Sequence, residues 1–463
     1  MNELKKNMVF TSDVVDLTHE GQGVVKIGGF PLFVENALPG EQIEVRVTKV
    51  GKNFGFGRLE RLIKQSPFRM NEINLDYLRT GIADFGHLQY EQQLEYKQKQ
   101  VVELLHKTAH KENFPVEPIL PAEQTKAYRN KAQVPVREIN GQIETGFYRK
   151  NSHQLVPISD FYIQDPIIDN LVNTIRDGLR AFGQASKIAY NEQTRKGWLR
   201  NLVIRRAYHS HEIMLVFVVT NAKFPFPQKE FLAELIEKFP ELKSIQLNIN
   251  KTDGSFILGK KYVTIYGSDT IKDTMLGKTY EISAPSFYQV NTSQAEKLYQ
   301  TAYEFAELKQ EDTIIDAYSG IGTIGLSVAD QVARVYGMEV IPAAVTNAIR
   351  NADLNHFNNV KYEVGAAEEI MPQWLEDGIK PDVIFVDPPR KGLDERFIET
   401  ATKVGARSVI YISCNPATFA RDVIRFEQNG YQLERVRPVD LFPQTHHIEL
   451  VGKFTNVEKN NIM

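Results

Sequence analysis

The C-terminal part of this chain, from about residue 282 to 455, alternates between runs typical of strands and segments typical of helices. Each strand-like run is short, apolar and rich in β-branched residues. The runs are 313–316, 332–337, 383–386, 408–412 and 447–451. Alternation of this kind predicts an α/β fold with a mostly parallel, Rossmann-like sheet, and it places a ligand crevice at the carboxyl ends of the strands.

Two further regions precede this one, since 463 residues are too many for one ordinary hydrophobic core. Residues 8–62 hold short β-branched runs separated by glycine turns, and we expect an OB-like β-barrel of about five strands. Such a barrel often binds single-stranded nucleic acid, although it can also serve for packing or dimerisation. Residues 125–280 hold more strands, in an α+β arrangement whose strand order the pattern leaves open.

One helix is expected at residues 91–108, and three prolines after it end it. Its apolar stripe would consist of Leu94, Val101, Val102, Leu104 and Leu105. We therefore expect three domains. They are the barrel (1–62), a central α+β domain (63–90 and 125–281) and the Rossmann-like domain (91–124 and 282–463).

The charge pattern favours a polyanionic partner. The net charge is only −3, but cations interleaved with aromatic residues gather at residues 49–64, 126–150 and 195–206. Any one run alone would be interpreted as a solvated face. Within the last run, Arg205 and Arg206 are the candidates for contact with RNA phosphates.

The chain shows no signal peptide and no apolar stretch of about 18 residues. We therefore expect a cytoplasmic protein without a membrane partner. No long heptad pattern or apolar patch predicts an obligate oligomer, so a monomer is expected.

Cys414 is the only cysteine, which excludes an intrachain disulfide and a metal site of several cysteines. Free cysteines are often buried and inert. This one lies in Ser413-Cys414-Asn415-Pro416, directly after the predicted strand 408–412, where open α/β sheets place their chemistry. We therefore interpret Cys414 as a candidate nucleophile.

The predicted strand 313–316 is followed by a glycine-rich loop, Asp316-Ala317-Tyr318-Ser319-Gly320-Ile321-Gly322-Thr323-Ile324-Gly325, that opens a helix. Glycines let this backbone turn tightly and approach a nucleotide-like ligand. Glu339 ends the next strand, where a carboxylate can accept both hydroxyls of a ribose. The ligand could be NAD or S-adenosylmethionine, and Asp316 together with the next motif favours S-adenosylmethionine.

Three more segments carry candidate chemistry. Asp387-Pro388-Pro389-Arg390 ends a strand, and its two prolines fix an extended backbone that can hold a carboxylate towards a cofactor or base. Ser286-Phe287-Tyr288-Gln289-Val290-Asn291 combines a ring that can stack on a base with an amide that can bond to its edge. Glu449, among apolar residues, is either a paired structural acid or a base with a raised pKa. The adjacent His446-His447 indicates a metal only faintly, and we expect none.

In this order, these motifs resemble those of the RNA uracil-5-methyltransferases, specifically the branch that acts on 23S ribosomal RNA and carries an N-terminal TRAM (OB-like) domain. The resemblance extends over nearly the whole chain. It implies a class I methyltransferase fold, S-adenosylmethionine as cofactor, and as substrate a uridine of folded RNA that is flipped out of its stack.

The resemblance also implies roles for single residues. Cys414 would be the nucleophile, Glu449 the base, and Phe287 and Gln289 would contact the uracil. The positions for S-adenosylmethionine would be Gln289, Tyr318, Gly320, Thr323, Glu339 and Asp387. The chemistry needs such groups, because uracil becomes nucleophilic at C5 only after a thiolate has added to C6, and a base must then remove the C5 proton.

One departure from the family concerns an iron–sulfur cluster that several members hold through four cysteines. The stretch that would supply three of them reads Ser66-Pro67-Phe68-Arg69-Met70-Asn71 here and has no thiol. We therefore expect no cluster, and a central domain closed by ordinary packing.

Three alternatives stay open. The tRNA-specific branch generally lacks the barrel, so residues 8–62 argue against it. A non-catalytic RNA-binding protein would need neither Cys414 nor Glu449, and a NAD oxidoreductase would have no use for Cys414.

Overall fold

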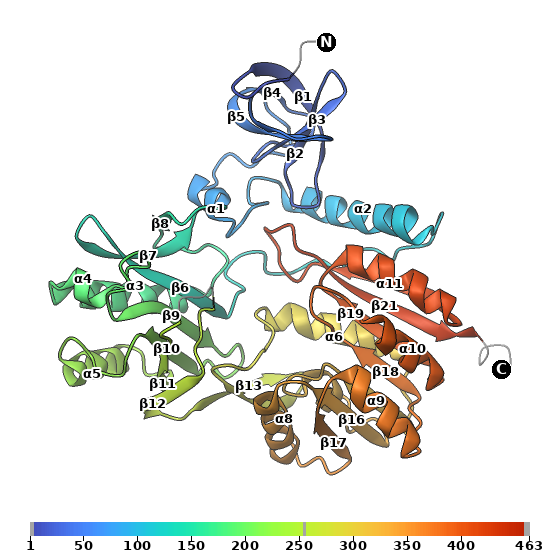
Figure 1. Cartoon of the computed structure of the whole chain (residues 1–463). Coiled ribbons are helices and arrows are strands. Elements are labelled where there is room, and N and C mark those ends of the chain that lie inside the picture. The colour runs from blue at the N-terminus through green and yellow to red at the C-terminus, as the bar shows by residue number, and fades with distance from the viewer. Residues whose placement is uncertain (1–3, 253–255, 458–463) are drawn as a thin grey trace.

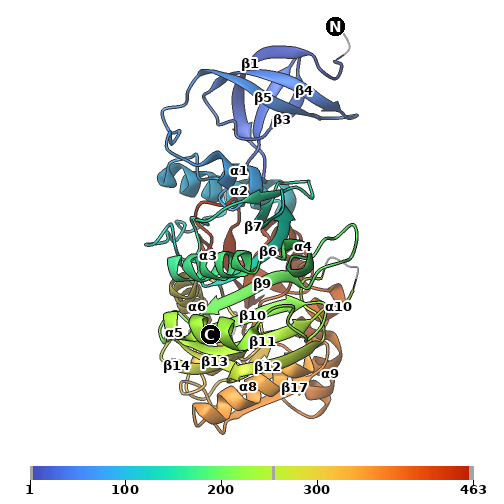
Figure 2. The ribbon, with the colours of Figure 1, turned by 90° about the vertical axis from the view of Figure 1, so that its left-hand side faces the viewer.

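The computed structural model describes residues 4–252 and 256–457. A closed barrel, two seven-stranded sheets and a two-stranded hairpin contain the named strands of these residues. The barrel lies at one end of the molecule, and the two large sheets lie beside each other below it (Figures 1 and 2).

The barrel confirms the OB-like module expected from the glycine-separated runs. Its strands are β1 (Val9–Leu17), β2 (Gly23–Ile27), β3 (Phe30–Val34), β4 (Gln42–Val50) and β5 (Gly55–Lys64), closed in the order β1-β2-β3-β5-β4. Burial alternates along β4, because successive side chains of a strand point to opposite faces. The inward side chains that form the core are Val14, Val25, Leu32, Val34, Ile43, Val45 and Val47.

The central sheet has the order β12-β11-β10-β9-β6-β7-β8 and is antiparallel except between β10 and β11. Its strands are β6 (Lys131–Ile139), β7 (Gln142–Tyr148), β8 (Leu155–Pro157), β9 (Leu199–Arg206), β10 (Ile213–Val219), β11 (Leu242–Ile249) and β12 (Lys261–Gly267). The helices of this region are α1 (Leu75–Thr80), α3 (Pro166–Ala181), α4 (Ala185–Ile188) and α5 (Gln228–Lys238). Apolar side chains of α3 and α5 share one core with the sheet.

A hairpin, β13 (Thr270–Met275) and β14 (Lys278–Ser283), leads to the second large sheet. That sheet has the order β17-β16-β15-β18-β19-β21-β20, in which only the pairings of β21 are antiparallel. Its strands are β15 (Thr313–Ala317), β16 (Arg334–Glu339), β17 (Val360–Val364), β18 (Val383–Val386), β19 (Ser408–Ser413), β20 (Tyr431–Val439) and β21 (Glu449–Asn456). This is the expected α/β class.

Helices cover both faces of this sheet, as the alternation of strands and helices requires. The core on one face includes side chains of α6 (Thr292–Ala306), α7 (Thr323–Ser327) and α8 (Pro342–Leu354). The core on the other face includes side chains of α2 (Tyr90–Ala109), α9 (Ala367–Glu376), α10 (Glu395–Lys403) and α11 (Pro416–Gln428). Neighbouring residues such as Ile314 and Ile315 enter opposite cores, so the sheet is apolar on both faces.

The structure differs from the expected elements at several points. β17 and β20 were not predicted, and β16 and β21 each begin two residues later than the expected runs. β17 is a short edge strand with alternating charge, and a register shift between Leu433 and Arg435 interrupts the alternation of β20. The expected apolar stripe of α2 was also partly wrong. Its buried face is Gln93, Lys97, Val101, Leu105 and Ala109, whereas Val102 is exposed.

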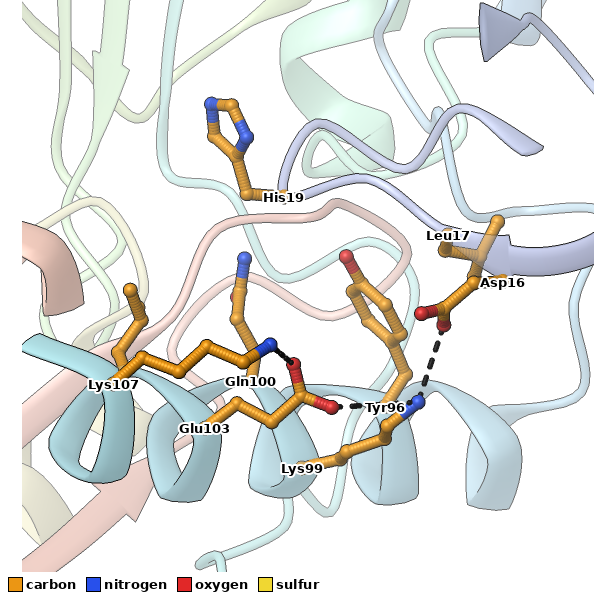
Figure 3. A pocket seen from close by; sticks show the side chains of 9 residues that line it. Asp16, Leu17, His19, Tyr96, Lys99, Gln100, Glu103 and Lys107 are labelled. Carbon is orange, nitrogen blue, oxygen red and sulfur yellow. Dashed lines mark hydrogen bonds and ion pairs between the residues drawn. The ribbon is translucent and has the colours of Figure 1, made fainter. Parts of the chain in front are cut away.

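The barrel rests on α2, and a small cavity of about 160 Å³ lies in this contact (Figure 3). Lys99 of α2 pairs with Asp16 of β1, and the Tyr96 hydroxyl donates to the carbonyl of Thr18 in the β1–β2 loop. A second contact is buried: Arg69 forms hydrogen bonds of 2.5 and 2.8 Å with the Glu41 carboxylate. Arg69 belongs to the stretch without cysteines, so an ion pair ties this stretch to the barrel.

Candidate active site

Strand register places four candidate residues at one edge of the C-terminal sheet. Parallel pairing sets Ala317 of β15 opposite both Met338 and Val386, and Val386 opposite Tyr411. The chain positions that follow these residues therefore emerge at the same edge. They are Tyr318, Glu339, Asp387 and, at the end of β19, Cys414.

The antiparallel strand β21 brings the fifth candidate to that edge. Ser413 pairs with Leu450, so the next positions along the two strands, Cys414 and Glu449, lie across from each other. β21 begins at Glu449, which makes this residue the first of its strand and not a mid-strand acid. The structure thus brings together Cys414, Glu449 and Asp387 from three neighbouring strands.

The glycine-rich loop is open on its outer side. A side chain at Gly320 would have no heavy atom within 4 Å, and the backbone there has φ of +56°. The Gly320 N–H donates to one oxygen of Glu339 at 3.2 Å, and the other oxygen accepts from the N–H of Ile341 at 3.0 Å. Tyr318 adopts a left-handed φ of +66°, which is strained for a tyrosine and is characteristic of functional loops.

Asp316 supports this loop from behind. It is fully buried, and its Oδ2 accepts the N–H of Gly325 at 2.9 Å while Oδ1 has no hydrogen-bond partner. Burial raises the pKa of this carboxyl to about 7. We therefore interpret Asp316 as a residue that holds the loop in shape, behind the space in front of Gly320.

The surface beside Glu339 fits a nucleoside. Val340 and Ile341 follow this carboxylate with side chains that are more than half exposed, and they can cover the face of a base. A carboxylate that accepts two backbone N–H groups retains lone pairs for ribose hydroxyls. Together with the free space at Gly320, these groups fit an adenosine-type ligand.

Gln289 and Thr323 meet at one hydroxyl group. The side-chain amide of Gln289 donates to the Tyr299 hydroxyl at 3.4 Å, and the Thr323 hydroxyl lies 3.4 Å from the same atom. Gln289 precedes α6 and Thr323 begins α7, so Tyr299 connects the segment before the sheet to the glycine-rich loop.

Burial at the cysteine edge shifts the pKa values of its acidic groups towards their neutral forms. Burial raises the pKa of the Cys414 thiol to about 11, with contributions from Glu449 and Asp387, while Arg390 opposes this shift. Burial likewise raises the pKa of Glu449 well above its usual range, and that of Asp387 to about 7. Perturbed groups that face one another in this way are typical of active sites.

The two loops at this edge are bonded to each other through Asn415. Its Oδ1 accepts from the N–H of Ala417 at 3.1 Å and caps α11, while its Nδ2 donates to the carbonyl of Arg390 at 3.0 Å. The cysteine loop and the Asp-Pro-Pro-Arg loop are therefore held as one unit. Asn415 lies in the predicted motif, but no pattern in the sequence indicates Arg390 as its partner.

Contacts with α2 hold the segment that leads to Glu449, and these contacts were not predicted from the sequence. Lys97 forms a fully buried ion pair with Asp440 at 2.6 Å, and Tyr90 donates to the same carboxylate at 2.8 Å. Gln93 exchanges hydrogen bonds with Gln444, accepting its N–H at 3.0 Å. Gln93 and Lys97 continue, at a spacing of four, the helical face of Val101, Leu105 and Ala109, and this alignment with apolar residues was the available signal that they are buried.

Two histidines complete this connection. The carboxylate of Asp84 accepts both the N–H of His446 at 3.1 Å and its ring Nδ1 at 2.7 Å. The rings of His446 and His447 lie 4.2 Å apart, and Nδ1 of His447 lies 3.5 Å from the Arg390 guanidinium. Burial lowers the pKa of His447 to about 3, so this ring is neutral beside the arginine. Among the described residues, no group of three or more His, Cys, Asp or Glu could hold a metal ion.

Phe287 and the arginines expected to contact RNA have different positions. Phe287 is 66% exposed, although it lies between two buried residues, Ser286 and Tyr288. Arg205 is buried, and its guanidinium donates to the carbonyls of Ser286 at 3.0 Å and Tyr288 at 3.4 Å. The interpretation of Arg205 as a phosphate contact was therefore wrong, because its charge lies beneath the Phe287 loop and supports it.

Arg206 is half-buried and pairs with Asp165 at 2.7 Å. A groove of about 930 Å³ opens instead on the central sheet and reaches the Phe287 loop. Its cationic and aromatic side chains include Arg129, Lys131, Arg137, Arg195, Arg200, Phe147, Tyr148, Tyr190 and Phe256. The second and third basic runs thus meet here, while the first run lies on the barrel.

A protein-family model described as tRNA (Uracil-5-)-methyltransferase matches residues 89–455, which is most of the chain. The chain belongs to this family. A second model, for the TRAM domain, matches residues 8–59, which form the barrel of this chain. The family expected from the motifs is confirmed, together with its N-terminal barrel.

Proteins similar to this family member include two bacterial relatives, each described as an uncharacterized RNA methyltransferase. The one from Lactococcus lactis is 63% identical and covers 98% of each chain. The one from Streptococcus mutans is 54% identical over 97% of this chain and 99% of its own.

No helix among the described residues is long and apolar enough to cross a membrane.

A solved structure similar to this chain is the Pyrococcus abyssi tRNA (uracil-54, C5)-methyltransferase in complex with S-adenosyl-L-homocysteine. It is 26% identical, with a TM-score of 0.76, and the match covers 96% of this chain and 100% of that one. The part of this chain that lies outside the match has fewer residues than the barrel, so the match includes barrel residues. The expectation that residues 8–62 argue against the tRNA-specific branch was therefore wrong.

Proposed function

We propose that this protein methylates C5 of a uridine in 23S ribosomal RNA through a covalent bond between Cys414 and C6. The observation that carries the proposal is the meeting of Cys414, Glu449 and Asp387 at the sheet edge, beside a loop that fits a nucleoside. A binding protein with an inactive fold would need neither the nucleophile nor the buried acid next to it.

The residues that would hold S-adenosylmethionine are Gln289, Tyr318, Gly320, Thr323, Glu339 and Asp387. When bound, this cofactor supplies an electrophilic methyl group for C5 of the uracil. Glu339 would accept the ribose hydroxyls, and Gly320 leaves the room that the ligand requires. Phe287, which is exposed, would stack near the flipped uracil, and Gln289 would bond to it.

The protein's own chemistry then has two steps. The Cys414 sulfur adds to C6 as a thiolate, the C5–C6 π electrons form a C4–C5 double bond, and the C4–O4 π electrons move onto O4, which gives an enolate that is nucleophilic at C5. After C5 has received the methyl group, the Glu449 carboxylate takes the C5 proton, the C5–C6 double bond re-forms and the Cys414 thiolate leaves. Arg390, which opposes the raised pKa of both groups, favours their charged forms.

The ribosomal target rests on the order of the motifs and on their resemblance to that branch. Transfer RNA is the second candidate, because the Pyrococcus abyssi protein that matches nearly the whole chain is a tRNA enzyme. We further propose that the protein acts as a cytoplasmic monomer of three domains, with the boundaries given above, and sedimentation of the full chain tests its oligomeric state.

The experiment is methyl transfer from labelled S-adenosylmethionine to unmodified 23S RNA and, separately, to bulk tRNA, with Cys414→Ala as control. We expect label in 23S RNA that is lost in the variant. Label in tRNA alone would replace the substrate by the second candidate, and turnover by Cys414→Ala would contradict the nucleophile. Absence of label in both RNAs would contradict the proposed function.

A further inference from the structure

Three phenylalanine rings gather on the outside of the barrel. Phe33 and Phe54 are stacked, with ring centroids 5.1 Å apart and planes at 23°. Phe56 stands edge-on to both, at 6.0 Å from Phe33 and 5.7 Å from Phe54. The rings come from β3, from the turn before β5, and from β5, and the register pairs Phe33 directly with Phe56.

This cluster is not part of the hydrophobic core. The core side chains of the barrel point inward from alternate positions, such as Leu32 and Val34 on either side of Phe33. Phe54 is 43% exposed. A small barrel that leaves Phe54 exposed and the two adjacent rings only partly buried gives up part of the stabilisation of their burial, so a binding role is the physical reason to expect for such a patch.

The charges around the rings favour an anionic partner. The arginines of the barrel have acidic partners, because Arg46 and Arg58 share Glu60, and Arg61 pairs with Glu44. The lysines of the β4–β5 region are different: among the described residues, no carboxylate pairs with Lys49 or Lys52, both of which are exposed. Lys49 is also the register partner of Phe56, which places a free cation directly beside the rings.

We propose that Phe33, Phe54 and Phe56, with Lys49 and Lys52, form a second RNA-binding surface that stacks unpaired bases of the substrate at a distance from the methylated uridine. This inference rests on the proposed function, and it adds that the substrate offers a single-stranded segment there. Rings bind the faces of unpaired bases and lysines bind the phosphates between them, whereas a duplex has no free base faces to offer.

The position of the surface sets the length of RNA that it requires. β1 pairs antiparallel with β4, and the β1–β2 loop rests on α2, so the β4–β5 turn that carries Phe54 lies at the opposite end of the barrel. Nine residues of β4 separate the two ends, which is roughly 25 Å. At about 3.4 Å per stacked nucleotide, the RNA must extend by about seven nucleotides beyond α2 to reach the rings.

The direct test replaces Phe54 by tryptophan in the full chain and records its fluorescence during titration with a 12-nucleotide oligouridine. Both natural tryptophans, Trp198 and Trp374, are buried, so the new side chain reports on the surface. We expect quenching by the single strand and none by a duplex of the same length. Phe68→Trp, at a phenylalanine with the same exposure outside the cluster, is the matched control and should not be quenched.

Affinity provides the second measurement. Phe54→Ala should weaken binding of the oligonucleotide about tenfold, as expected for the loss of one stacked base. Lys49→Gln with Lys52→Gln should lower the slope of log affinity against log salt by about 1.4. Arg61→Gln, which removes a cation already paired with Glu44, should leave the slope unchanged.

Three outcomes would overturn the inference: no quenching at position 54, equal quenching by single strand and duplex, or self-association of the chain that Phe54→Ala abolishes. The last result would assign the patch to a second copy of the chain. Because the oligonucleotide assays need no methyl transfer, they separate failure of this inference from failure of the proposed function.

Discussion

Cys414 and Glu449 face each other across two strands, and burial holds both in their neutral forms in the free protein. Once it has lost its proton, a carboxylate with a raised pKa is a stronger base than an ordinary glutamate, which suits it to removing a proton from carbon. The same burial makes the thiol a poor nucleophile until the uracil binds. Reactivity therefore belongs to the assembled complex and not to the free cysteine.

Glu449→Gln should let the covalent bond to C6 form and prevent its release, because an amide cannot take the C5 proton. We expect turnover to fall by about 10²–10⁴-fold. A protein–RNA band should accumulate in a denaturing gel, and it should be absent from the double variant with Cys414→Ala. Normal turnover of Glu449→Gln without a band would show that another group removes the proton.

Asp387 makes the stability of the folded protein depend on pH. Its pKa is about 7 in the folded protein and about 4 when unfolded. The folded state thus binds more protons between these values, and the free energy of unfolding falls as pH rises from about 4 to 7. Asparagine has no proton to lose, so Asp387→Asn should be more stable than the parent protein at pH 8. We expect a gain of about 1–2 kcal/mol in the free energy of unfolding, a value reduced because Asp387 is partly exposed to solvent. The gain should be smaller at pH 5.

Urea unfolding of the ligand-free protein at the two pH values measures this difference. Asp377→Asn, at an exposed carboxylate, serves as the control and should change little at either pH. A gain for Asp387→Asn that is equal at pH 5 and pH 8 would contradict the raised pKa.

At the scale of elements, the catalytic base depends on a helix distant from it in sequence. β21 begins at Glu449, and the segment before it forms hydrogen bonds with Gln93 and Lys97 of α2 and with Asp84. Because these contacts are buried, each unpaired group would cost more than an exposed one. α2 therefore positions the base, although no residue of α2 is placed at the sheet edge.

Lys97→Met tests this dependence, because it leaves the Asp440 carboxylate buried without its cation. We expect a loss of about 3–5 kcal/mol in the free energy of unfolding, together with a lower kcat. Lys99→Met, two positions away in an exposed pair with Asp16, should cost no more than about 1 kcal/mol and leave kcat unchanged. Adding Asp440→Asn should restore part of the stability, and a Lys97→Met protein of normal stability would contradict the role of the pair.

The sequence predicted the parts of the fold that have a local signal. Alternating strands and helices, strand-end motifs and the glycine-rich loop placed Cys414 and Glu339 at the edge where register brings them. It did not predict contacts between distant segments. Val102 of α2 has the composition of a core residue but is exposed, whereas Lys97 is buried because Asp440, 343 positions away, pairs with it. Arg205 was misinterpreted for the same reason, since its partners lie about 80 positions away.

At the scale of the whole molecule, α2 lies between the barrel and the base segment (Figure 1). Lys97 of α2 holds the base segment, while Tyr96 and Lys99 contact the barrel. A further anchor of the barrel is the buried pair of Arg69 and Glu41, in the stretch 66–71 that has no cysteine. The position of the ring surface relative to the active site thus depends on a few polar contacts.

Arg69→Met should loosen the barrel, because it leaves the fully buried Glu41 without its cation at a cost of about 3–5 kcal/mol. If the barrel holds one end of the RNA and the sheet edge the other, the consequence depends on the length of the RNA. KM for a long substrate that reaches the rings should rise about tenfold, the contribution of a stacked base, while kcat changes little.

A fragment with fewer than about seven nucleotides beyond α2 cannot reach the rings, so its KM should be the same for Arg69→Met and the parent protein. Arg61→Met, in an exposed pair on the same barrel, is the matched control for both substrates. An equal rise in KM for long and short RNA would mean that Arg69 acts on the catalytic domain itself. In that case the barrel would not be a separate point of attachment for the substrate.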